Sequence, residues 1–279
     1  MNGAGKRRSS SARITSESCP EVPLDAARLK VLRALRRQWS NRRCALVGAT
    51  ALEVRLGLRW RTTQDLDLAL EVTPEELSEG METLVGWSRV SEQRWRSPEG
   101  VLVDLIPAGP ELVAAGEIVW PGSEVRMSLV GFGHALRSSD EVRLGQDLTF
   151  PVAPVAVIAL LKMSAYLDRP TERGKDLEDL VYILAEYIRP DDPRRYSEEV
   201  FHEELDYEQV SSFLLGKEMG KFTAKSDREV IRRFLVRVRN AGDPLGTQGR
   251  MAASLPPSSQ DRVEELLGFI AVFEKGLGW

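Results

Sequence analysis

The chain has 279 residues, of which 42% are hydrophobic and 29% are charged, and its formal net charge is −4. This composition is typical of a globular protein with enough sequence for one large or two modest domains. It contains no apolar run long enough to span a membrane. Two cysteines are too few for a disulfide scaffold, so a reducing cytoplasm is the expected compartment. The isolated His134 and His202 argue against a zinc site or a histidine-based triad.

The charge is distributed unevenly along the chain. Residues 1–61 hold 14 Lys or Arg against 4 Asp or Glu, whereas the remainder holds 24 against 38. Such an excess can steer a polyanion towards a site, and it is equally consistent with a basic tail followed by a solvated helix face. Residues 1–22 are rich in Ser and Arg and lack an apolar segment, so we predict a disordered basic tail and no secretory signal.

The most chemically specific stretch is 44–70. Residues 44–47 form a short apolar run that predicts a buried strand, and Gly48 permits a sharp turn from that strand into a helix. The helical spacing of 49–58 places a helix N-terminus at this turn, where unpaired backbone N–H groups suit a phosphate. The hydroxyl of Thr50 would add a further hydrogen bond there.

A strand with two aspartates follows this helix. Alternate residues of a strand share a face, so Asp65 and Asp67 project together while the intervening leucines face the core. A third acid, Asp104, lies in the apolar run 101–106, which also predicts a strand. Neighbouring carboxylates repel one another unless a cation lies between them, and Mg²⁺ prefers such oxygen ligands. The alternative is that these residues belong to the polar face of a half-exposed sheet.

The rest of the chain is predicted mainly from periodicity, caps and turn residues. Helices are expected at 24–40 with Asp25 as N-cap, 73–87, 155–167, from Thr171 to 188, 206–220, 226–240 and 259–275. Strands are expected at 88–96, 101–106, 125–130, 141–144 and 148–152, a Ser-Pro-Glu-Gly turn joining the first two. Residues 189–200 are expected to be a connection, and 245–257 a loop.

Two motifs in this chain resemble those of a known superfamily. Gly48-Ala49-Thr50-Ala51-Leu52, and Arg61-Thr62-Thr63-Gln64-Asp65-Leu66-Asp67-Leu68 after it, resemble the glycine and D-x-D motifs of nucleotidyltransferases. The resemblance is closest to the AbiEii/AbiGii-type toxins of type IV toxin–antitoxin and abortive-infection systems, and it covers about residues 25–190. Ala49 departs from the pattern, because many members carry a second Gly or a Ser there.

A second resemblance lies in the helical region. The pattern K-x-x-A-x-x-x-R followed by K-D-x-x-D-L resembles the helical-domain motifs of the same toxin family. It carries over to Lys162, Arg169, Lys175, Asp176 and Asp179. The resemblance implies that Lys162 contacts nucleotide phosphates and that Asp176 orients this lysine or the acceptor group. From the residues alone, charges of this kind are better explained as a solvated helix face with ion pairs.

The resemblance implies an α/β (α+β) fold with a nucleotidyltransferase core, a mixed sheet flanked by helices, followed by a C-terminal helical domain. We place the core at 23–152 and the helical domain at 153–279. It implies an enzyme that uses an NTP and Mg²⁺ and moves a nucleoside monophosphate onto an acceptor hydroxyl. Asp65, Asp67 and Asp104 would form a site for one or two metal ions, and Asp104 would also help to deprotonate or position the acceptor. Gly48, Ala49 and Thr50 would hold phosphates.

The sequence leaves the acceptor open. The toxin resemblance and the basic segment 1–61 favour RNA, for instance the 3′ end of a tRNA. A protein hydroxyl and a small molecule such as an aminoglycoside are the alternatives. Two other classes of function also stay open: a nucleotide-binding regulator without turnover, and a module that binds a cognate antitoxin.

Overall fold

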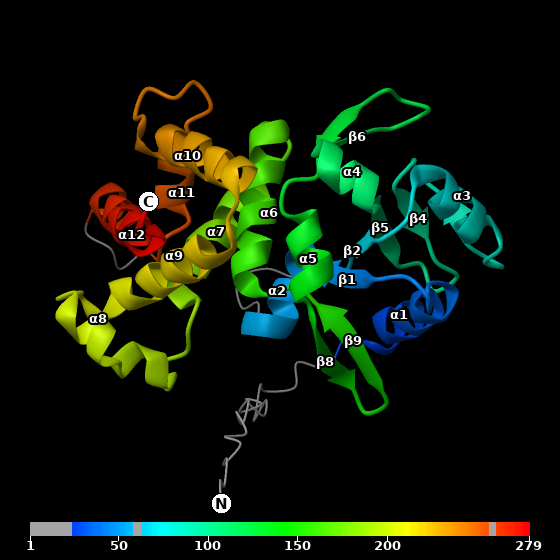
Figure 1. Cartoon of the computed structure of the whole chain (residues 1–279), viewed down its shortest axis with the longest axis horizontal. Coiled ribbons are helices and arrows are strands. Elements are labelled where there is room, and N and C mark those ends of the chain that lie inside the picture. The colour runs from blue at the N-terminus through cyan, green and yellow to red at the C-terminus, as the bar shows by residue number, and fades with distance from the viewer. Residues whose placement is uncertain (1–23, 58–62, 257–260) are drawn as a thin grey trace, which may run out of the picture.

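The computed structural model describes residues 24–57, 63–256 and 261–279, and Figure 1 shows how their elements are arranged. The predicted disordered tail and the Arg61-Thr62 start of the D-x-D motif lie outside these residues. Within them, a mixed sheet has the strand order β3-β4-β5-β2-β1-β9-β8, and β6 pairs with β7 in a separate ribbon. The strands are β1 (Cys44–Val47), β2 (Leu66–Leu70), β3 (Ser88–Arg89), β4 (Arg94–Arg96), β5 (Leu102–Pro107), β6 (Glu117–Val119), β7 (Arg126–Ser128), β8 (Asp140–Gly145) and β9 (Leu148–Val152).

The centre of the sheet is fixed by the register of three strands. β2 runs antiparallel to β1 and parallel to β5, so that Asp67 lies opposite Val47 on one side and Asp104 on the other. Leu66 and Leu68 are fully buried, as the alternation of apolar and acidic residues predicts. The β2 and β5 aspartates are therefore direct neighbours, although 37 positions separate them in the chain.

The first part of the chain supplies the helices that pack around the sheet: α1 (Ala26–Gln38), α2 (Gly48–Leu56), α3 (Pro74–Glu82), α4 (Pro110–Ala115) and α5 (Phe132–Ser138). The predicted N-cap of the first helix is confirmed, because Asp25 accepts a hydrogen bond from the backbone N–H of Arg28. Thr73 and Glu76 form a capping box at the start of α3. This helix ends at Glu82, before the predicted end.

The second part of the chain is helical. It comprises α6 (Val155–Asp168), α7 (Gly174–Glu186), α8 (Glu198–His202), α9 (Val210–Phe222), α10 (Lys225–Arg239), α11 (Thr247–Ala253), α12 (Arg262–Leu277) and the short 3₁₀ turns η1 (Pro193–Tyr196) and η2 (Tyr207–Gln209). In Figure 1, α6 stands between the sheet and the remaining helices, and 11 of its 14 residues are buried. One hydrophobic core continues from the sheet through α6 into the other helices.

Several predicted elements are wrong. Residues 111–150 contain α4 and α5 beside the predicted strands, and 245–257, predicted as a loop, contains α11. None of the residues of α4 is buried, and the sequence shows no apolar periodicity that predicts this helix. Its only sequence signals were Pro110 at its start and Gly116 at its end. Strand 88–96 divides into β3 and β4, the connection 189–200 contains η1 and part of α8, and α7 begins at Gly174 rather than after a Thr171 cap.

Within the three described ranges, no helix has both the length and the apolar character that crossing a membrane requires.

Candidate active site

Gly48 connects β1 to α2 in a left-handed backbone conformation, with φ of +68°. A Cβ at this position would lie 2.2 Å from Oδ2 of Asp67, which is closer than any real contact. Both conformation and space therefore require glycine here. The turn brings the N-terminus of α2 next to the Asp67 carboxylate of β2.

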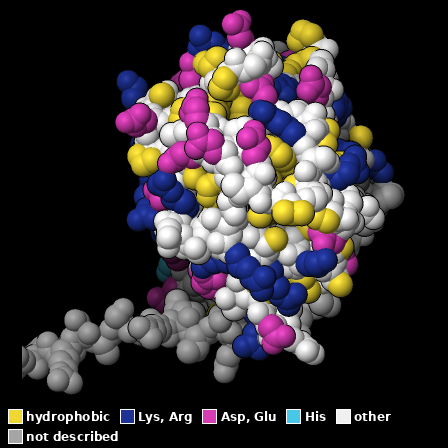
Figure 2. All heavy atoms as spheres, turned by 90° about the vertical axis from the view of Figure 1, so that its right-hand side faces the viewer, with side chains coloured by type: hydrophobic (Ala, Val, Ile, Leu, Met, Phe, Trp, Pro, Cys, Tyr) yellow, Lys and Arg dark blue, Asp and Glu magenta, His cyan; other side chains and the backbone are white. Residues whose placement is uncertain are grey.

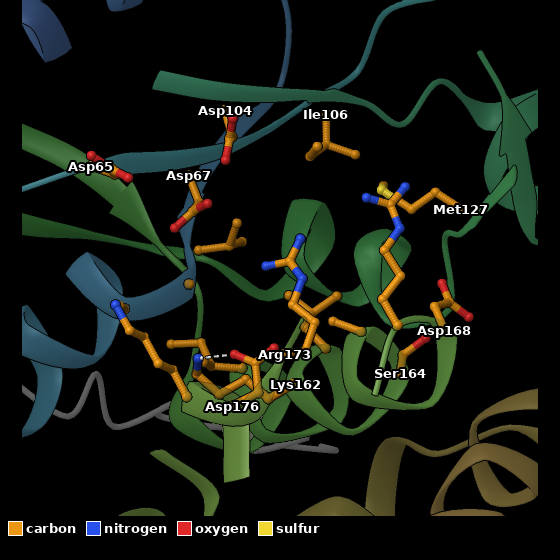
Figure 3. A pocket seen from close by; sticks show the side chains of 18 of the residues that line it. Asp65, Asp67, Asp104, Ile106, Met127, Lys162, Ser164, Asp168, Arg173 and Asp176 are labelled. Atoms are coloured by element: carbon orange, nitrogen blue, oxygen red, sulfur yellow. Dashed lines mark hydrogen bonds and ion pairs between the residues drawn. The ribbon is translucent and has the colours of Figure 1, made fainter. Parts of the chain in front are cut away.

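The three predicted aspartates line one pocket of about 520 Å³, a volume usual for small-molecule sites. Figure 3 shows Asp65, Asp67 and Asp104 at one end of this pocket. Asp65 lies immediately before β2 rather than within it, and its side chain is about half exposed. The side chain of Asp104 is only 13% exposed, so the carboxylates range from open to nearly enclosed.

Asp67 has the most perturbed carboxyl group of this set. Burial, followed by the negative charge of Asp104, raises the pKa of Asp67 to about 7, and Lys162 and Arg173 only partly oppose this increase. The free protein therefore holds a carboxyl group that would ionise more readily beside a cation. Such a group is a frequent mark of a functional site.

Arg94 was not predicted, and it binds the third aspartate. It lies on β4 directly opposite Asp104 on β5. Its Nε donates to Oδ1 of Asp104 at 2.7 Å and its Nη2 donates to Oδ2 at 2.6 Å, a bidentate ion pair. The same Nη2 lies 3.9 Å from Oδ2 of Asp65. The pairing follows from the hairpin register: the Ser97 N–H donates to the backbone oxygen of Val101, and counting three residues outwards from this pair places position 94 opposite position 104.

Lys162, predicted to contact phosphates, lies at the pocket wall and is itself buried. Its Nζ lies 2.8 Å from Oδ1 of Asp176 and 2.5 Å from Oδ2 of Asp179. Burial alone would lower the pKa of Lys162, but the two carboxylates raise it above the usual lysine value. The ammonium group therefore stays charged and ties α6 to α7. Oδ2 of Asp176 is buried and has no hydrogen-bond partner among the described residues.

The wall opposite the aspartates carries further basic residues. The predicted Arg169 and Lys175 both line the pocket, as does Arg173, which was not predicted. Figure 3 shows Arg173 projecting into the space between the aspartates and the far end of the pocket. All three belong to the end of α6, the loop after it and the start of α7. This loop therefore faces the acidic edge of the sheet with positive charge.

Two predicted nucleotide ligands do not line the pocket. Thr50 is fully buried, and its hydroxyl donates to the backbone oxygen of Asp65 at 2.7 Å. It thus fixes the segment that carries the aspartates instead of reaching into the pocket. Asp179 is also fully buried, behind Lys162. Ala49, by contrast, lines the pocket beside Gly48.

The pocket also has an apolar part of its lining and a polar end away from the three aspartates. The apolar lining residues are Ile106, Met127, Phe132, Ile158 and Leu161. Polar groups border the polar end: the Ser164 hydroxyl donates to the Ser128 hydroxyl at 2.9 Å, and the Ser128 N–H donates to Asp168 at 2.8 Å. Figure 3 shows Met127, Ser164 and Asp168 on the side away from the three aspartates. This arrangement suits a planar apolar group with hydrogen-bonding edges.

The positive charge near the start of the chain is largely compensated. Basic residues between positions 28 and 55 form ion pairs with carboxylates from other segments: Arg28–Glu53, Lys30–Glu99, Arg36–Glu141, Arg42–Glu76 and Arg55–Asp140. On the face that carries α1 and α3, basic and acidic side chains are interspersed (Figure 2). The described part of the basic segment 1–61 therefore resembles a solvated face more than a uniform polyanion-binding surface.

The donors at the acidic end fit a hard cation in part. Asp65 and Asp67 offer carboxylate oxygens to the pocket, and Mg²⁺ is commonly held by one or two carboxylates together with substrate phosphates. Both oxygens of Asp104, however, are bound by Arg94. In the portion of the chain that the structure describes, no group of three His, Cys, Asp or Glu is placed to hold a metal ion.

Comparison with known proteins gives a family match over most of the chain. A family model described as "Nucleotidyl transferase AbiEii toxin, Type IV TA system" matches residues 30–244. No curated protein matches significantly. Among solved structures, a candidate nucleotidyltransferase from H. pylori is 16% identical, with 91% of this chain and 96% of that chain covered and a TM-score of 0.34. A CCA-adding enzyme in complex with ATP is 15% identical, with 92% and 61% covered and a TM-score of 0.31. These low scores carry no argument about substrate or mechanism.

Proposed function

The chain belongs to the AbiEii family of nucleotidyl transferases, and on that premise we propose that it transfers a nucleoside monophosphate from an NTP to an acceptor hydroxyl in a metal-dependent reaction. The observation that carries the proposal is the contact between Gly48 and Asp67 inside a pocket that three aspartates line. A turn that admits no side chain leaves room for phosphate oxygens beside the carboxylates.

The pocket supports one orientation of the NTP. The triphosphate would lie between the aspartates and the basic loop, where Arg173, Lys175 and Arg169 offset its charge. The nucleoside would extend towards Met127 and Phe132, with its polar edges near Ser128, Ser164 and Asp168. Gly48 and Ala49 would offer the backbone at the start of α2 to the phosphates.

Asp65 and Asp67 are the residues that would hold Mg²⁺. Held there, Mg²⁺ would supply positive charge that offsets the charge on the leaving pyrophosphate. The chain's own groups position the reactants: Arg94 orients Asp104, and Lys162 orients Asp176. The unpartnered Oδ2 of Asp176 and the carboxylate of Asp104 are the candidates to accept the proton of the attacking hydroxyl. Most of the rate enhancement would come from positioning and charge stabilisation.

For the acceptor we propose RNA, with a tRNA 3′ end as the first candidate, because the matched family consists of toxins of type IV toxin–antitoxin systems. We place the enzyme in the cytoplasm, where the buried free thiol of Cys44 would remain reduced. An antitoxin is the corresponding partner. A protein hydroxyl or an antibiotic is the alternative acceptor. Because the described basic residues between positions 28 and 55 form ion pairs, their charge does not by itself favour RNA over these alternatives.

The test is label transfer. Purified protein is incubated with each α-³²P-labelled NTP, Mg²⁺ and total cellular RNA and protein, and the products are separated by size. We expect a labelled RNA band that disappears in the Asp65→Ala/Asp67→Ala variant. A labelled protein band would name the other macromolecular acceptor. NTP binding without any labelled macromolecule would favour a small-molecule acceptor or a regulator, and absence of both label and NTP binding would refute the proposal.

A further inference from the structure

The position of Arg94 bears on how many cations the site holds. Three aspartates at one pocket end carry three negative charges if all are ionised, and one of them is already matched by a guanidinium group. Arg94 engages both oxygens of Asp104, and the ion pair is shielded because only 13% of the Asp104 side chain is exposed. The two remaining negative charges, on Asp65 and Asp67, would be balanced by one divalent cation.

The backbone fixes this ion pair. Arg94 and Asp104 occupy paired positions of antiparallel strands, and Asp104 in turn pairs with Asp67 of β2. The three side chains therefore form a row across one face of the sheet, with the guanidinium at the outer end. The hydrogen bonds and the negative charge of Asp104 raise the pKa of Arg94 above its usual value and outweigh burial, which lowers it, so the arginine stays charged.

We propose that Arg94 takes the place of a second metal ion: it holds Asp104 as an ion pair and limits the site to a single divalent cation, bound through Asp65 and Asp67. This inference rests on the proposed function and refines it. Asp104 then acts as a positioning or proton-accepting carboxylate for the acceptor and not as a metal ligand.

The experiment counts bound metal without requiring turnover. The full-length protein is titrated with Mn²⁺ alone, and free Mn²⁺ is followed by electron paramagnetic resonance. We expect a single bound ion in the wild type, a loss of affinity of about tenfold or more in Asp67→Asn, and little change in Asp104→Asn. In Arg94→Gln, the released Asp104 should add a second ion or strengthen binding by about tenfold.

Two controls make the result specific. Arg94→Lys keeps the positive charge and should still bind a single ion, which separates charge neutralisation from the loss of a long side chain. Arg96→Gln changes the same residue type two positions further along β4, where it lies opposite Leu102 and not Asp104, and should leave Mn²⁺ binding unchanged. Circular dichroism confirms that each variant is folded.

The outcomes distinguish the inference from the function on which it rests. Two ions in the wild type, one of them lost in Asp104→Asn, would overturn the single-cation arrangement and leave nucleotidyl transfer intact. An Arg94→Gln variant that binds Mn²⁺ like the wild type would overturn it as well. If the wild type binds neither Mn²⁺ nor any NTP, the proposed function itself fails, and this inference fails with it.

Discussion

At the scale of single residues, the contact between Gly48 and Asp67 connects local conformation to chemistry. The sequence predicts a glycine turn from the end of an apolar run. It does not predict that a side chain at this turn would collide with a carboxylate 19 positions later, because that distance depends on the register of β1 and β2. Local turn chemistry is visible in a sequence, whereas contacts between strands require their pairing.

Two glycines at the ends of α2 allow this contact to be tested. Gly48 and Gly57 have similar φ values, +68° and +72°, but a Cβ at Gly57 meets nothing within 4 Å. Gly57→Ala should therefore cost only the backbone strain, about 1–2 kcal/mol of unfolding free energy. Gly48→Ala should cost more and should also abolish label transfer, because Asp67 must move. Urea unfolding and transfer assays measure the two effects.

Equal stabilities and equal activities of the two variants would show that the contact with Asp67 does not matter.

The raised pKa of Asp67 predicts a pH-dependent stability. Because this pKa is about 7 in the folded protein, against 3.8 ordinarily, the stability contributed by the protonated group is full below about pH 4 and is lost as the pH rises through 7. Asp67→Asn keeps a neutral side chain. In metal-free buffer, the unfolding free energy of Asp67→Asn relative to that of the wild type should rise by roughly 2–3 kcal/mol between about pH 5 and 8. A constant difference across this range would contradict the prediction.

At the scale of elements, the α6–α7 pair and the β4–β5 hairpin complete the pocket. The sequence predicts α6 well because its apolar residues continue over a length that suits a helix better than a strand. The resemblance supplied Lys162 and Asp176, but not the fact that the lysine is enclosed by two aspartates. Arg94 was missed because β4 is only 3 residues long and gives almost no periodic signal. Its position becomes evident only when the hairpin register is counted from the turn.

The two pocket lysines should behave differently. Lys162→Met leaves two buried aspartates without their cation, so unfolding free energy should fall by about 3–5 kcal/mol. Lys175 is exposed, so Lys175→Ala should leave stability within about 0.5 kcal/mol of the wild type and weaken NTP binding. Chemical unfolding and equilibrium NTP binding measure these effects. A Lys162→Met protein as stable as the wild type would show that this ion pair has no structural role.

At the scale of the whole molecule, the proposed boundary between 23–152 and 153–279 runs beside α6. This helix is the first element of the helical part, yet it packs against α2 and α5 as well as against α7 and α10. The class of fold follows from the order of the elements. The sequence could not predict that α6 packs against both parts of the chain, because an apolar helix does not reveal which neighbours cover its faces.

Because α6 is covered from both sides, the helical part should not fold alone. Expressed as residues 153–279, it would expose the apolar residues of α6 that α2 and α5 cover in the full chain, so we expect a poorly folded, aggregation-prone fragment. Thermal circular dichroism and hydrogen exchange provide the measurement, with the full-length chain as control. A cooperative melting transition of the fragment would show instead that the boundary separates two independent folding units.

The pocket takes its walls from both sides of α6: the aspartates come from the sheet, and the basic loop joins α6 to α7. A nucleotide bound there would bridge the two parts of a single core. By mass action, a ligand that prefers the folded chain raises its melting temperature as the ligand concentration increases. The melting temperature of the full chain, measured with each NTP in turn, therefore identifies the nucleotide that binds best. This measurement requires no knowledge of the acceptor.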